Sequence, residues 1–143
     1  MITDELIENI TKILENFKKI SLNTHTELIE FAIFFKDLSS LCDKNIAKLE
    51  NFKEEDIKND IKNYSGDILD KEISKLKSVK SIILSYCNFN FHCNVDEMIY
   101  KVKTSKNSEE SFKFYQEHLC ILSNKIIDYL NTCYLEHNIK MAR

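Results

Sequence analysis

The sequence contains no proline and only one glycine among its 143 residues. Tight turns between strands use Gly, Asn or Pro, and α/β folds need glycines where strands meet helices. A chain of this length with average usage would carry roughly ten glycines. The shortage of both residues excludes the all-β and α/β classes. It predicts a single all-α domain over residues 1–143, with few and simple turns.

Other shortages narrow the possible functions. Arg143 is the only arginine and the net charge is −3, so neither specific base readout nor general nucleic-acid binding is expected. No Gly-rich loop is present to cradle a phosphate group. No apolar run approaches the ~18 residues of a membrane span. Asp4, Glu5 and Glu8 interrupt any apolar start, so we expect no signal peptide.

The candidates for chemistry are few. Five cysteines, an odd number, predict reduced thiols in the cytoplasm. Cys87, His92 and Cys93 are the best metal candidates, but their spacing fits no CxxC pair and no fourth ligand is nearby. Nothing pairs a nucleophile with a base and an oxyanion hole. We therefore expect a protein that is not an enzyme, with no metal, cofactor or small-molecule substrate.

Apolar spacing predicts three long antiparallel helices, over residues of about 3–50, 53–88 and 95–141. The turns between them are expected at 51–56 and 88–94. The clearest apolar seam lies in the third helix, where spacings of three and four alternate as in helices that pack on other helices. Its members are Phe112, Tyr115, Leu119, Leu122, Ile126, Tyr129 and Cys133.

The first helix contains one irregularity. Two successive spacings of four meet at Thr24, which in a continuous helix is a stutter that locally unwinds the supercoil. Residues 23–27 could instead form a loop, with Thr24 and Glu27 as the capping box of a new helix. We favour one continuous helix because the phase of the seam persists across the site. A broken helix would give a compact four- or five-helix bundle, as in viral host-modulating or cytokine-like folds.

Residues 27–49 are apolar on two faces, which is typical of a helix that is buried on two sides. A central position in a larger bundle or a partner chain would provide this burial. If a partner chain provides it, the residues buried in the dimer interface would be Leu28, Phe31, Ile33, Phe34, Phe35, Leu38 and Leu41.

Charge is unevenly distributed. Residues 1–70 carry nine Lys against fifteen Asp and Glu, whereas residues 71–106 carry seven Lys against three, a local balance of +4. A reversal of the chain near 88–94 would bring the lysines before and after it together at one end. Each Lys near an anionic bilayer contributes ~1 kcal/mol of attraction. An ordinary solvated face is the alternative interpretation.

Two stretches carry a family resemblance. DIKNYSGDILDKEISKLK (60–77), leading to Phe89 and Phe91, resembles the second helix of BAR domains, the membrane-curvature modules of endophilin and amphiphysin. SEESFKFY (108–115) and LSNKIIDYLNTCYLEH (122–137) resemble the third helix of that family, and the first helix matches only in pattern. The resemblance covers most of the chain.

The resemblance implies a dimer, with itself or with a related chain, that forms a curved six-helix bundle. It implies a cytoplasmic protein, peripheral on anionic membranes, that senses or scaffolds curvature in endocytosis or vesicle trafficking. The chain is short for the family, and no N-terminal insertion helix is expected. An adaptor-like interaction bundle, spectrin-like or coiled coil, is the alternative. By position, the lipid-binding role would fall on Lys75, Lys77, Lys80, Lys101, Lys103 and Lys106.

Overall fold

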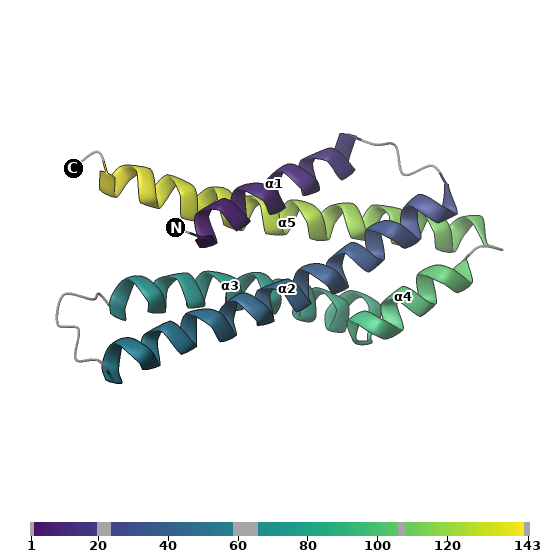
Figure 1. Cartoon of the computed structure of the whole chain (residues 1–143). Helices are drawn as coiled ribbons and strands as arrows, with labels where there is room; N and C mark the ends of the chain where they lie inside the picture. The colour runs from purple at the N-terminus through teal and green to yellow at the C-terminus, as the bar shows by residue number, and fades with distance from the viewer. Residues whose placement is uncertain (1, 20–23, 59–65, 106–107, 142–143) are drawn as a thin grey trace.

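The described part of the chain is entirely helical, without a strand, in the computed structural model (Figure 1). The structure describes residues 2–19, 24–58, 66–105 and 108–141, with side chains over 5–16, 24–55, 68–105 and 108–133. The expected all-α class is confirmed. The elements are α1 (Ile2–Lys19), α2 (His25–Lys58), α3 (Gly66–Tyr86), the π-helical turn η1 (Cys87–Phe91), α4 (Val95–Thr104) and α5 (Glu109–Met141).

Helix α2 is the central element of the bundle. In Figure 1, α1 and α5 lie on the upper side and α3 and α4 on the lower side, and α2 runs obliquely from the end of the bundle near α4 to a position below α3. It packs against all four of these helices. Helices of the same chain therefore cover the main apolar face of α2 and part of its second apolar face.

The core follows from this central position. Leu28, Phe31, Phe35 and Leu38 of α2 are at most 2% exposed. The Phe31 and Phe35 rings lie 4.9 Å apart between their centroids. Burial of one large apolar side chain stabilises a fold by about 1.5–3 kcal/mol, so this row contributes a large share of the stability.

The prediction of one helix over residues 3–50 is wrong, because α1 ends at Lys19 and α2 begins at His25. The capping-box alternative holds instead. The Thr24 hydroxyl accepts a hydrogen bond from the Glu27 backbone N–H at 3.2 Å and donates one to Glu27 Oε1 at 2.7 Å. The first bond satisfies a backbone N–H that a helix start leaves unpaired, and the second holds the Thr24 hydroxyl in place. The apolar phase persists across the site because both helices face the same core.

The other predicted boundaries also need correction. The turn expected at 51–56 lies inside α2, which continues to Lys58. The helix expected over 95–141 is divided into α4 and α5. Its start is confirmed, since the Asn94 side chain accepts a hydrogen bond from the Glu97 backbone N–H at 2.9 Å. The division follows from two serines, because Ser105 donates to the Val102 carbonyl and the Ser108 hydroxyl caps α5 at Ser111.

The seam of α5 faces the core as predicted. Leu119, Leu122 and Ile126 are fully buried, and the seam residues before and after them are partly buried. Two apolar residues of α1, Ile10 and Leu14, are also buried, and α1 packs against α5. The alternation of threes and fours thus identified the buried face of α5 correctly.

Replacing Phe31 by Ala should lower the free energy of unfolding by about 3–5 kcal/mol, because the deletion leaves a cavity in the centre of the bundle. Phe52, also on α2, is 46% exposed. The matched Phe52→Ala change should alter stability by less than about 0.5 kcal/mol. Urea denaturation followed by circular dichroism measures both values. Equal losses for the two variants would contradict the central position of Phe31.

Candidate interaction surface

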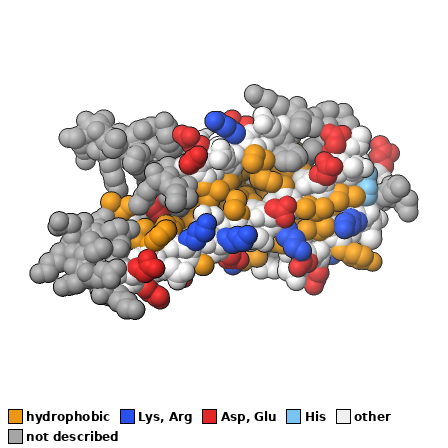
Figure 2. Space-filling model, in the orientation of Figure 1, with side chains coloured by type: hydrophobic (Ala, Val, Ile, Leu, Met, Phe, Trp, Pro, Cys, Tyr) orange, Lys and Arg blue, Asp and Glu red, His pale blue; other side chains and the backbone are white. Residues whose placement is uncertain are grey.

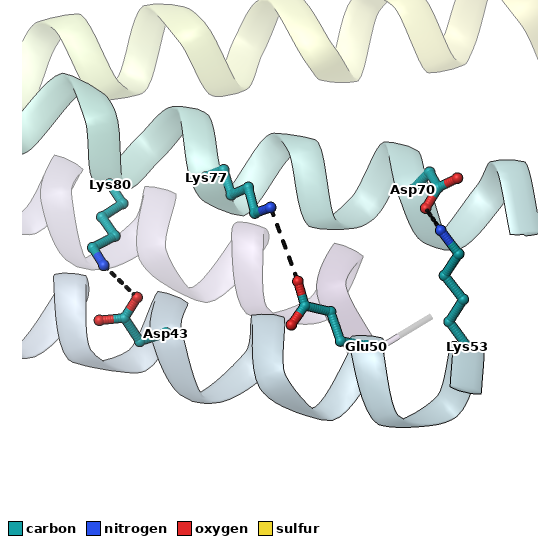
Figure 3. A network of polar contacts seen from close by, with 6 residues as sticks. All are labelled: Asp43, Glu50, Lys53, Asp70, Lys77 and Lys80. Carbon is teal, nitrogen blue, oxygen red and sulfur yellow. Dashed lines mark hydrogen bonds and ion pairs between the residues drawn. The ribbon is translucent and has the colours of Figure 1, made fainter. Parts of the chain in front are cut away.

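Lysines of the basic stretch form ion pairs between α2 and α3. Lys80 lies 2.6 Å from Asp43 and Lys77 lies 3.9 Å from Glu50. A third pair runs the other way, with Lys53 of α2 at 2.6 Å from Asp70 of α3. Figure 3 shows these three pairs spaced along the two helices. Each pair is at least partly exposed to solvent and is screened by salt, so the pairs align the helices more than they stabilise them.

The order of these pairs shows how α3 and α4 lie. Near the start of α2, Lys36 pairs with Asp96 of α4 at 2.8 Å. Further along α2, Asp43 and Glu50 pair with α3. Helices α3 and α4 therefore lie end to end along α2 (Figure 1). The expected reversal near 88–94, which would have brought the two groups of lysines together, does not occur.

The remaining predicted lipid-binding lysines are dispersed. Lys75 pairs with the buried Glu72 one turn away, at 3.3 Å. Lys101 donates a hydrogen bond to the Phe91 carbonyl at 2.8 Å. Lys103 is exposed on α4, and Lys106 lies outside the described residues. On the face in Figure 2, Lys side chains are interspersed with Asp and Glu instead of forming one basic patch.

The predicted dimer-interface residues divide into two groups. Leu28, Phe31, Phe35 and Leu38 belong to the core of the single chain. Ile33 and Phe34 are partly buried against that core, and Leu41 is 38% exposed. Helices of the same chain therefore bury the first group, whereas they cover the second group only in part.

A cluster of aromatic rings fixes the end of α3 against α5. The Tyr86 hydroxyl and His118 Nδ1 are hydrogen-bonded at 2.7 Å. Phe91, at the end of η1, packs its ring against Tyr86, Tyr115 and His118 at centroid distances of 5.5–5.8 Å. Burial, followed by the nearby Glu117 carboxylate, raises the pKa of Tyr86, so the hydroxyl stays protonated at neutral pH.

Beside this cluster lies an open hollow of about 400 Å³ between α3, η1 and α5. Phe89 lies at its rim and is 82% exposed, the most exposed large apolar side chain in the described part of the chain. An apolar ring in water is unfavourable, and such side chains mark binding surfaces when they adjoin a hollow. The lining consists of Ser81, Ile82, Ser85, Tyr86, Phe89, Asn90 and Lys125.

The cysteines and His92 form no recognisable reactive site. Within the described ranges, no three His, Cys, Asp or Glu side chains converge in a way that could hold a metal ion. Cys87 and Cys93 are buried, whereas His92 is exposed and ends η1 with a φ of 54°. Burial raises the pKa of Cys87, and also that of Cys42, to about 11. These thiols are poor nucleophiles because the reactive thiolate is scarce at neutral pH.

Sequence reasoning missed two features. Nothing in the sequence indicated that His25 Nε2 bonds the Val102 carbonyl at 2.8 Å, a contact that ties the start of α2 to the end of α4. The exposure of Phe89 was also missed. In CNFNF (87–91), nothing in the sequence indicates that Phe91 is buried and Phe89 is not, because a π-helical turn does not follow the spacing of an α-helix.

Cys42 and Cys87 should react with iodoacetamide at pH 8 about 100-fold more slowly than an ordinary cysteine, because the raised pKa lowers the thiolate fraction by that factor. Cys133, half-buried on α5, should react faster than either. Peptide mapping by mass spectrometry after timed alkylation gives the individual rates. In urea, all five cysteines should react at similar rates. Rapid labelling of Cys42 in the folded protein would contradict its burial.

Comparisons with protein-family models, with curated proteins and with solved structures give no match. The resemblance to BAR domains therefore stays a prediction. Among the described residues, no helix is both long enough and apolar enough to cross a membrane.

Proposed function

We propose that the chain is a non-catalytic helical interaction module, which binds a protein partner through the hollow between α3, η1 and α5. The observation that carries this proposal is the exposure of Phe89 at the rim of the hollow. The aromatic cluster behind it supports a preformed surface, since Tyr86, Phe91 and His118 are packed together. A rigid apolar side chain beside a hollow is the usual form of an interface hot spot.

The intramolecular contacts of the basic-stretch lysines also favour a protein partner over a membrane. Lys77 and Lys80 are engaged with carboxylates of α2, and Lys101 is engaged with a backbone carbonyl. A lysine that binds lipid headgroups must exchange such partners for phosphate, which reduces its net contribution. The electrostatic attraction to an anionic bilayer depends on unpaired charge near the surface.

A curvature-sensing membrane module is the second candidate function. It is favoured by the balance of +4 over residues 71–106 and by Lys103, which has no ion-pair partner among the described side chains. The mixed charges on the face in Figure 2 support it less well than the hollow supports protein binding.

The main proposal predicts that a photoreactive p-benzoylphenylalanine in place of Phe89 captures a protein of defined mass in cells that make this chain. The same probe in place of Phe52, an exposed position on α2, should capture little. Ser85→Arg, which fills the hollow, should reduce capture at position 89 by roughly tenfold. Denaturing electrophoresis and mass spectrometry give the yield and the mass of the adduct.

The matched control is Ser40→Arg, which introduces the same side chain at an exposed position on α2 and should leave capture at position 89 unchanged. Equal capture at positions 89 and 52, or capture that Ser85→Arg does not affect, would show that the hollow is not the binding surface.

The two candidate functions differ in their response to lipid. If the hollow carries the function, co-sedimentation with liposomes at low salt should show no preference for anionic over neutral lipid. The Lys103→Glu variant should then sediment like the unmodified chain. A strong preference for anionic liposomes that Lys103→Glu abolishes would favour the membrane candidate.

A further inference from the structure

Three exposed residues of α5 form a stripe beside the hollow. Glu117, Ile121 and Lys125 follow one another at intervals of four, and Ile121 is 37% exposed. Lys125 lines the hollow, and Glu117 lies close enough to Tyr86 to raise its pKa. Unlike the lysines along α2, neither charge has an ion-pair partner among the described side chains. An apolar residue is thus flanked by two unpaired charges of opposite sign.

This stripe is complementary to itself. If two copies of α5 lie antiparallel about a twofold axis at Ile121, Glu117 of each copy faces Lys125 of the other. With a rise of 1.5 Å per residue, each charge lies ~6 Å along the helix from the axis, so both pairs form in the same register. A twofold interface requires this reciprocity, because each residue pair occurs twice. The charge order Glu–Ile–Lys provides it.

The position of Phe89 agrees with the same axis. Tyr86 contacts His118, and Phe91 contacts Phe114, so α3 and α5 run antiparallel. In this register Phe89 lies on the Glu117 side of Ile121. Rotation about the axis carries the ring to the other end of the hollow in the second copy. Ser81 and Lys125 line the hollow, and the antiparallel order of α3 and α5 places them toward that end.

We propose that the partner at the hollow is a second copy of this chain, held by reciprocal Glu117–Lys125 ion pairs, by Ile121 packed on Ile121, and by Phe89 in the hollow of the other copy. The inference rests on the proposed function and names its partner. It places the dimer interface on α3 and α5, whereas the sequence analysis placed it on α2.

Sedimentation equilibrium of the full chain tests this inference. The unmodified protein should reach twice its monomer mass of 16.9 kDa. Lys125→Glu and Glu117→Lys should each raise the dimer dissociation constant roughly tenfold or more, because each places like charges opposite one another at two sites. The double exchange Glu117→Lys with Lys125→Glu should restore dimerisation, because the opposite charges face one another again. Phe89→Ser should weaken the dimer without a charge change.

Lys103→Glu is the matched control, since it reverses an exposed Lys on α4 and should leave the dimer unchanged. Circular dichroism verifies that each variant is folded. A monomer at all concentrations would overturn the inference, as would a dimer that tolerates both single reversals. Failure of the double exchange to restore the dimer would also overturn it. If the chain is monomeric while the probe at position 89 captures a different protein, the proposed function stands and self-pairing fails.

Discussion

The burial of the main apolar face of α2 is the constraint on which the rest of the structure depends. Exposure of Phe31, Phe35 and Leu38 to water would cost a large free energy, and Ile33 and Phe34 beside them also pack partly against the core, so a single neighbouring helix does not cover α2. The long apolar stretches of the sequence are divided into shorter helices, and these helices pack against α2 from several sides. Breaks at Thr24 and Ser108, where hydroxyls cap the new helices, make this packing possible.

The same arrangement determines what the charged residues do. Because α3 lies along α2, Lys77 and Lys80 face acidic residues of α2 and form ion pairs that connect the two helices. On α5, Glu117 and Lys125 have no ion-pair partner among the described side chains. The candidate binding surface is therefore not the basic stretch but the surface of α3 and α5, where Phe89 adjoins a hollow.

Parts of the fold and of the surface could be read from the sequence. The shortage of Pro and Gly predicted the all-α class, and the seam through Leu119 predicted the buried face of α5. The division into three helices failed because apolar spacing reports which face of a helix is buried and not the direction of the next helix. The surface at Phe89 was missed because its exposure depends on a π-helical turn, which α-helical spacing does not anticipate.

The sequence by itself determined the helical class and the apolar seam of α5, because these depend on composition and on the local spacing of apolar residues. Thr24 and Glu27 were a possible cap before any tertiary contact was considered. Only the tertiary structure decided that α2 is covered by its own chain, that Lys80 meets Asp43 and that Phe89 stays outside. These outcomes depend on residues far apart in sequence, whose meeting is set by packing the whole core and not by local spacing.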